Sequence, residues 1–147
     1  MSEPERTPAT VFRHEFTVPK TVIDGNGHVN NVVFVQWMQD VATQHFESLA
    51  GADAMKSAGA MWVARSHTIE YFAPAFVGDR IQVTTWVASF SRVRSLRHYE
   101  FVRASDGKLL VKSQTDWVFV RASDGRPCSI PEAIKRVFGP LPEDPKL

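Results

Sequence analysis

The chain has 147 residues, of which 44% are hydrophobic and 22% charged, the size and composition of one globular domain with its own core. Its 17 lysines and arginines nearly balance 16 acidic residues, and the formal net charge of +1 argues against a nucleic acid partner, because such domains usually carry a basic excess. The one cysteine, Cys128, excludes an intramolecular disulfide and a Cys-rich zinc site.

The amino-terminal part is expected to start with a flexible segment, residues 1–10, in which charges and prolines stand where a signal peptide would be apolar. No run approaches the roughly 20 apolar residues that span a bilayer, so we expect a cytoplasmic protein with no membrane partner. Residues 12–18 alternate between apolar and polar side chains, which is typical of a strand, and the next residue, a proline, ends the pattern. Turn-forming residues 24–27 follow, after which Asn30 or Asn31 can cap a helix.

A long helix is predicted over residues 31–49, where apolar side chains recur at intervals of three and four and Gly51 supplies the stop. Three valines near its start widen the apolar surface, which is typical of a central helix enclosed on most sides. Residues 52–59 are predicted as a connector of small residues with a short helical turn.

Four long strands are predicted in the second half of the chain, because apolar and polar residues alternate there between turn signals. They cover residues 61–72, 80–90, 95–104 and 109–121. Asp106-Gly107 is a strong hairpin signal, and residues 130–138 are predicted as a short helix before a Pro-rich tail, 140–147. We therefore predict an α+β fold, with one strand, a long helix, four antiparallel strands and a terminal helix.

The turn before the predicted long helix is dense in polar groups. Residues 22–31 contain an acid, Asp24, an imidazole, His28, three asparagines and two glycines. Asp24 can act as a base or nucleophile and His28 as a proton partner, while unpaired N–H groups at the helix amino end can stabilise charge on a carbonyl oxygen. These are the parts of an acyl-transfer site, although each residue is also typical of an ordinary turn or cap. No metal is expected, because no second His or Cys is spaced around His28 as a metal site requires.

The same segment resembles the motif of hot-dog-fold acyl thioesterases, both the bacterial 4-hydroxybenzoyl-CoA thioesterase-like acyl-CoA hydrolases and the plant-type acyl-ACP thioesterases. The matching pattern is Asp24-x-Asn26-x-His28-Val29-Asn30-Asn31-x-x-Phe34, followed by Trp37. Downstream, the similarity continues through Trp62-Val63, Ile69-x-Tyr71-x-x-Pro74-Ala75 and Val77-Gly78-Asp79 to Ile130-Pro131. It covers about residues 12–138.

The resemblance implies one hot-dog domain over residues 11–139, in which a five-stranded antiparallel sheet wraps around the long central helix. It also implies a homodimer or a homotetramer with active sites at the protomer interface. By position, Asp24 corresponds to the catalytic carboxylate, and Asn26 and His28 to the catalytic Asn and His of the plant-type enzymes. The 4-hydroxybenzoyl type lacks that histidine. The amide of Asn31 lies near the donor that polarises the thioester carbonyl.

The reaction expected from this motif is hydrolysis of an acyl thioester, acyl-CoA or acyl-ACP, to a free acid and a thiol. Asp24 either activates water or attacks the carbonyl carbon directly, and both routes stay open. His28 and Asn26 would orient the water or the carboxylate. No cofactor is expected, because the thiolate is already a good leaving group and coenzyme A is part of the substrate.

Substrate-binding residues are expected around the turn, on the helix, on the second strand and in a basic cluster. They are Gly27, Asn30, Phe34, Trp62, Val63, Arg92 and Arg94. Arg92 and Arg94, with Arg97, form the densest basic group, which suits the phosphates of coenzyme A or an acidic carrier protein but is also typical of a solvated strand end. Two other functions stay open: a hot-dog hydratase or dehydratase that acts on an acyl thioester, and a non-catalytic acyl-CoA-binding module.

Overall fold

Five strands and three α-helices make up the part of the chain that the structure, a computed structural model, describes: residues 10–49 and 51–141. In chain order they are β1 (Val11–Thr17), α1 (Asn31–Ser48), α2 (Gly51–Ala58), β2 (Ala60–Tyr71), β3 (Arg80–Phe90), β4 (Arg94–Arg103), β5 (Leu109–Arg121) and α3 (Glu132–Val137). Each predicted strand and the long helix lie within one residue of the predicted bounds. The connector, predicted with a short helical turn, is helical over most of its length and forms the eight-residue helix α2. Most of the predicted flexible start and Pro-rich tail, residues 1–9 and 142–147, lies outside the described residues.

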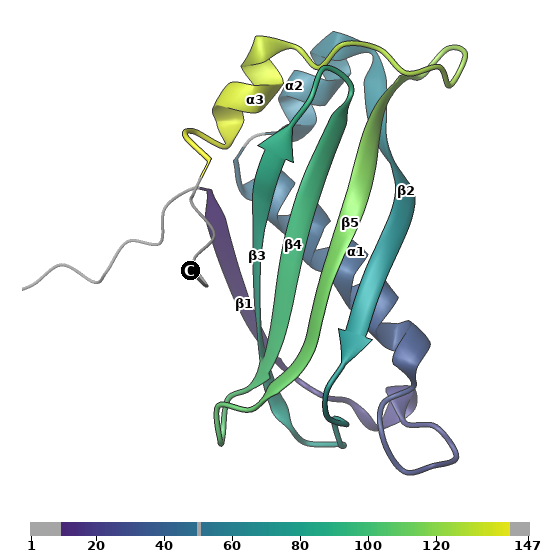
Figure 1. Cartoon of the computed structure of the whole chain (residues 1–147), viewed down its shortest axis with the longest axis vertical. Helices are drawn as coiled ribbons and strands as arrows, with labels where there is room; N and C mark the ends of the chain where they lie inside the picture. The colour runs from purple at the N-terminus through teal and green to yellow at the C-terminus, as the bar shows by residue number, and fades with distance from the viewer. Residues whose placement is uncertain (1–9, 50, 142–147) are drawn as a thin grey trace, which may run out of the picture.

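The strands form one antiparallel sheet in the order β1-β3-β4-β5-β2, and α1 packs across one face of it (Figure 1). Successive residues of a strand point to opposite faces, so alternation decides which side chains meet the helix. On β4 the helix side receives Ser95, Arg97, Tyr99 and Phe101, all of which are buried. The predicted α+β arrangement, a five-stranded antiparallel sheet with the long helix against it, is confirmed.

Helix α1 begins at a capped turn and buries one face. The Asn30 side chain accepts a hydrogen bond from the Val32 N–H at 3.1 Å, which is the N-cap arrangement. The side chains buried against the sheet are Phe34, Met38, Val41, Ala42 and His45. The prediction of a helix enclosed on most sides is wrong for the single chain, because the sheet covers only one side and Val32 is 67% exposed. Neither α1 nor any other helix of the described residues is long and apolar enough to cross a membrane.

Strand β2 is an edge of the sheet. It pairs with β5 from Ala60, opposite Arg121, to Tyr71, opposite Val111, and no other strand in the described part of the chain pairs with its second edge. Its 12 residues make it long beside an ordinary strand of about 5–6 residues. Met61 is one of the exposed apolar side chains on it. An unpaired edge of this length is a ready template for pairing with a second chain.

The loops gather at two opposite ends of the sheet (Figure 1). The turn before α1, the β2–β3 connection and the β4–β5 hairpin lie at one end, and α2, α3 and the β3–β4 turn lie at the other. Backbone hydrogen bonds join the turn to the β2–β3 connection, for example from the Val29 N–H to the Ala75 carbonyl oxygen at 2.8 Å. At about 3.3 Å per strand residue, the length of β3 separates the two ends by roughly 35 Å.

Candidate active site

Asp24 opens a tight turn shortly before α1. Its backbone N–H donates to the His28 carbonyl oxygen at 2.9 Å, and its carbonyl oxygen accepts from the Gly27 N–H at 3.1 Å. Gly27 has a φ of 85°, a conformation that favours glycine. The Asp24 Oδ1 accepts from the Asn26 N–H at 2.9 Å, as Asp side chains do in Asx turns. One carboxylate oxygen therefore holds the turn, while Oδ2 makes no hydrogen bond to any other described residue.

The amino end of α1 supplies an unpaired donor. Within the residues that the structure describes, the Asn31 N–H donates to no other residue. The Tyr71 hydroxyl donates to the Asn31 carbonyl oxygen at 2.9 Å, and burial raises the pKa of that phenol, which keeps it protonated. Because the Asn31 N–H lies at the positive end of the helix dipole, it can donate to a carbonyl oxygen that gains negative charge.

A cavity of ≈ 290 Å³ lies beside this helix end. Its walls come from the turn, from α1, from β2 and from the β2–β3 connection: His28, Val29, Asn31, Phe34 and residues 71–75. The His28 ring meets the Phe76 ring edge to face, with centroids 6.3 Å apart. Phe34 is also part of the core, 5.2 Å from the ring of Phe101. The cavity is therefore lined by an imidazole, by the residue whose N–H has no partner among the described residues, and by apolar side chains, the usual make-up of a ligand pocket.

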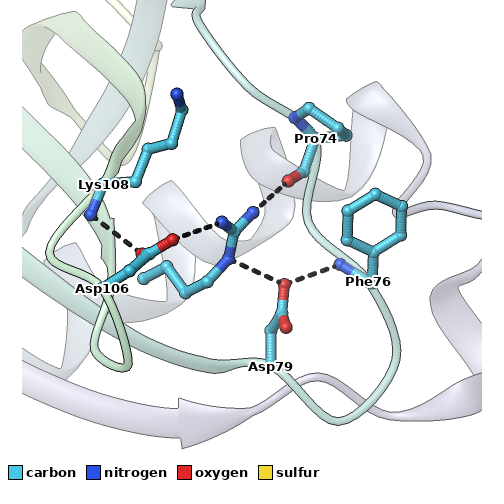
Figure 2. A network of polar contacts seen from close by, with 6 residues as sticks. Pro74, Phe76, Asp79, Asp106 and Lys108 are labelled. Atoms are coloured by element: carbon cyan, nitrogen blue, oxygen red, sulfur yellow. Dashed lines mark hydrogen bonds and ion pairs between the residues drawn. The ribbon is translucent and has the colours of Figure 1, made fainter.

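Arg103 of β4 holds the β2–β3 connection in place (Figure 2). Its Nε donates to Asp79 Oδ2 at 3.2 Å, its Nη1 to Asp106 Oδ2 at 3.0 Å and its Nη2 to the Pro74 carbonyl oxygen at 2.8 Å. Asp79 Oδ2 also accepts from the Phe76 N–H at 2.9 Å. One guanidinium thus fixes the segment that carries Phe76 against His28.

Trp62 and Val63, predicted to bind substrate, lie far from Asp24 in the same chain. Both stand near the start of β2, whereas Tyr71, which contacts the helix end, stands at its last residue. Trp62 packs on Phe119 with ring centroids 5.0 Å apart, and Val63 is exposed. Within one chain, Trp62 and Val63 therefore do not contribute to the Asp24 turn.

The predicted basic cluster divides between two faces of the sheet. Arg92, in the β3–β4 turn, donates to the Ser129 hydroxyl at 2.9 Å. Arg94 forms an exposed ion pair with Asp116, which raises the pKa of Arg94. Arg97 points inward and is buried, so the three arginines do not form one surface. Arg92 and Arg94 also lie at the end of the sheet opposite the Asp24 turn.

Residues 18–138 match the profile of the thioesterase-like superfamily, and this match spans most of the chain. The chain belongs to the thioesterase-like superfamily. No curated protein matches the chain. Membership of this superfamily agrees with the site, in which an imidazole and a helix amino end line a cavity. Asp24 is not a wall of that cavity and lies in the turn that carries His28.

Several solved thioesterase structures are similar to this superfamily member. A 1,4-dihydroxy-2-naphthoyl-CoA thioesterase from Synechocystis is 25% identical, with a TM-score of 0.78, over 87% of this chain and 95% of the other. A 12:0-ACP thioesterase from Umbellularia californica is 18% identical, with a TM-score of 0.80, over 92% of this chain and 52% of the other. A hypothetical protein from Staphylococcus aureus, in complex with CoA, is 16% identical, with a TM-score of 0.82, over 96% and 92%. These matches confirm the predicted hot-dog fold, and the family and fold together identify the chain as a thioesterase.

Three residues that shape the site have no predicted role in the sequence. Tyr71 shares strand parity with Ile69, which places both on the helix side of β2, but its bond to Asn31 spans 40 positions. Arg103 stands at a strand end next to an Asp-Gly turn, where a basic residue is ordinary. Phe76 lies in a loop without periodicity. Non-local contacts of this kind have no local sequence signal.

Proposed function

We propose that this thioesterase hydrolyses acyl-CoA to a free acid and coenzyme A at the amino end of α1. The observation that carries the proposal is the Asn31 N–H, which has no partner among the described residues and belongs to a residue that lines the same cavity as His28. Asp24 Oδ2, likewise without a hydrogen bond to those residues, lies in the same turn. Two similar structures, a 1,4-dihydroxy-2-naphthoyl-CoA thioesterase and a protein in complex with CoA, support CoA as the thiol.

In the proposed reaction the thioester carbonyl oxygen accepts a hydrogen bond from the Asn31 N–H. One well-aimed donor of this kind stabilises the transition state by about 3 kcal/mol. Asp24 removes a proton from water as the water oxygen bonds to the carbonyl carbon. The C–S bond then breaks, and the departing thiolate takes up that proton. His28 and Asn26 orient the water.

A second route starts from the same binding of the thioester carbonyl oxygen to the Asn31 N–H. Asp24 attacks the carbonyl carbon, the thiolate leaves, and water hydrolyses the resulting mixed anhydride. Neither route uses a cofactor, because the thiolate is a good leaving group. Single-turnover hydrolysis in ¹⁸O-labelled water separates the two, since only the anhydride route can place a protein oxygen in the acid product of the first turnover.

We further propose that the active unit is a homodimer paired through the free edge of β2. An isologous antiparallel pairing would set the first half of one β2 beside the last half of the other. Trp62 and Val63 of a second copy would then approach the cavity, which they cannot reach within one chain. The second copy's Arg92 could then pair with the phosphates of coenzyme A, since its one partner among the described residues is the neutral Ser129 hydroxyl.

The test is a thiol-release assay across acyl-CoAs of increasing chain length, aromatic acyl-CoAs and acyl carrier protein thioesters. We expect turnover of CoA thioesters, and a partial loss in His28→Ala. Absence of thiol release from every CoA thioester would contradict the proposal, and an unchanged rate in His28→Ala would leave that residue a structural role. Sedimentation of the active enzyme tests the dimer, since a stable and active monomer would contradict the shared site.

A further inference from the structure

Arg97 is a buried cation that has no counter-ion among the described residues. It lies on the helix side of β4 and is 4% exposed. Its Nη1 donates to His45 Nδ1 at 2.9 Å and to Thr85 Oγ1 at 3.1 Å. Its guanidinium carbon lies 5.7 Å from the centre of the Phe138 ring. Arginine only donates, so His45 Nδ1 is the acceptor and that ring is neutral.

Both hydrogen bonds of Arg97 come from the same nitrogen, Nη1. Among the described residues, no carboxylate forms an ion pair with Arg97, and its Nε and Nη2 make no hydrogen bond. Nε and Nη2 point in the same direction and form the two-donor edge that matches the two oxygens of a carboxylate. The protein therefore leaves unused the edge of Arg97 that is best suited to a carboxylate.

Burial of an unpaired charge is costly, and it lowers the pKa of Arg97 to about 10. The group still carries its charge near neutral pH. The hydrogen bonds from Nη1 to His45 and Thr85 offset part of this cost. A carboxylate ligand on the remaining edge would neutralise the buried charge.

Arg97 lines a partly open cavity of ≈ 160 Å³ between the sheet, α1 and the end of α3, which we call the Arg97 cavity. The walls are mainly aromatic, from Phe46, Trp62, Trp117 and Phe138. Ser95, two residues before Arg97 and on the same face of β4, adds a hydroxyl. A cavity of about 150 Å³ is large enough for benzene, so this one has room for a ring or a short alkyl chain.

This cavity is separate from the one at the thioester site. The two have no lining residue in common. Phe46 lies 15 residues after Asn31 on α1, which is about 22 Å along the helix axis. A ligand held by Arg97 therefore need not be the thioester under attack.

We propose that the Arg97 cavity binds a small carboxylate whose remaining part is apolar, either an aryl carboxylate or a short alkyl carboxylate. The carboxylate accepts from Nε and Nη2 of Arg97, and the apolar body packs among Phe46, Trp62 and Phe138. The inference does not rest on the proposed thioester hydrolysis, because Arg97 and not the Asp24 turn holds the carboxylate; Trp62 is the one wall residue that the proposed dimer contact also uses.

Tryptophan fluorescence can report binding in this cavity, because Trp62 and Trp117 line it. The test titrates the full-length protein with benzoate and hexanoate and follows tryptophan fluorescence, with benzyl alcohol, hexanol and inorganic phosphate as the comparison ligands. We expect saturable binding of the two carboxylates, at least about ten-fold tighter than the alcohols, and no saturable change with phosphate. Equal affinity for acid and alcohol, or no saturable response to either acid, would overturn the proposal without any variant.

Two variants locate the site. Arg97→Met removes the cation at similar length and is expected to weaken carboxylate binding by about ten-fold or more while the alcohols are unaffected. Arg94→Met, three positions earlier on the same strand but exposed, is the matched control and should bind as the original chain does. As a second readout, carboxylate should raise the melting temperature of the unmodified protein and of Arg94→Met, but not of Arg97→Met. Undiminished carboxylate binding in a folded Arg97→Met would refute the assignment.

Discussion

Arg103→Met is expected to loosen one wall of the active site, and the chain contains a matched control. The strand ends around Arg103 and Arg121 have nearly the same sequence, VRASDGK and VRASDGR. Arg103 pairs with Asp106, and Arg121 pairs with Asp124, each three residues later. Of the two arginines, Arg103 is the one that also holds the β2–β3 connection. Arg121→Met therefore removes the local pair alone, whereas Arg103→Met also removes the contacts to the wall of the site.

The expected difference follows from burial. The Arg121 side chain is 53% exposed, and an exposed pair of this kind contributes about 0.2–1 kcal/mol. The side chains of Arg103 and Asp79 are only 15% and 21% exposed, and the bonds from Arg103 to Asp79 and to the Pro74 carbonyl should add about 1–1.5 kcal/mol each. Arg103→Met should lower the free energy of unfolding by about 3 kcal/mol, against less than about 1 kcal/mol for Arg121→Met.

Thermal unfolding measures this difference directly. For a chain of this length, the melting temperature should fall by roughly 6–12 °C in Arg103→Met and by less than about 4 °C in Arg121→Met. Because the connection carries Phe76 against His28, kcat/KM for acyl-CoA should also fall about ten-fold in Arg103→Met alone. Equal losses of stability and activity in the two variants would refute the reasoning.

Three further predictions concern the hydrogen bonds of one side chain each. Asn30→Ala removes the cap of α1 and should lower the free energy of urea unfolding by about 1 kcal/mol, with Asn30→Asp as the control that keeps the acceptor. Tyr71→Phe removes the hydroxyl bond to the first residue of α1 and should lower stability by about 1 kcal/mol and reduce kcat, and an unchanged kcat would contradict its positioning role. Hydrogen bonds from the Lys108 N–H and Arg103 lower the pKa of Asp106, so its contribution is present above the ordinary pKa of the carboxyl and is lost as the pH falls through the lowered value. Urea unfolding of the unmodified chain and of Asp106→Asn should therefore differ near neutral pH and converge once the pH lies below the lowered pKa of Asp106, and a gap that persists in strong acid would contradict this.

The fold is largely readable from the sequence, because its signals are local. Alternation defines the strands, and the Asp-Gly hairpin and the Asn30 cap set element boundaries within a residue or two. The exposed outer face of α1 and the full length of the helix over residues 51–58, where a short helical turn is predicted, have no local signal, since both depend on what packs against them. A helix rich in valine has the same sequence whether a second sheet or only solvent covers its outer side.

Only part of the site can be predicted from the sequence. The polar turn before α1 is a continuous segment, so Asp24 and His28 stand out in the sequence. Arg97 lies two and four residues before Tyr99 and Phe101 on β4, so all three point to the same face of the sheet. The sequence does not say which of the two faces of β4 meets the helix. The anchoring of the β2–β3 connection by Arg103 depends on two segments that are 24 to 29 positions apart, and no local pattern reports such a contact.

Asp24→Asn tests the central claim most directly, with Asp124→Asn as its control. Both carboxylates accept a backbone N–H two residues later, at 2.9 and 3.0 Å, and the amide oxygen of asparagine can keep that bond. Both variants should therefore stay folded, with melting temperatures close to that of the unmodified chain. We predict that Asp24→Asn lowers kcat for thiol release from acyl-CoA by about 10²–10⁴-fold while Asp124→Asn leaves it unchanged. Full thiol release by a folded Asp24→Asn would contradict the account.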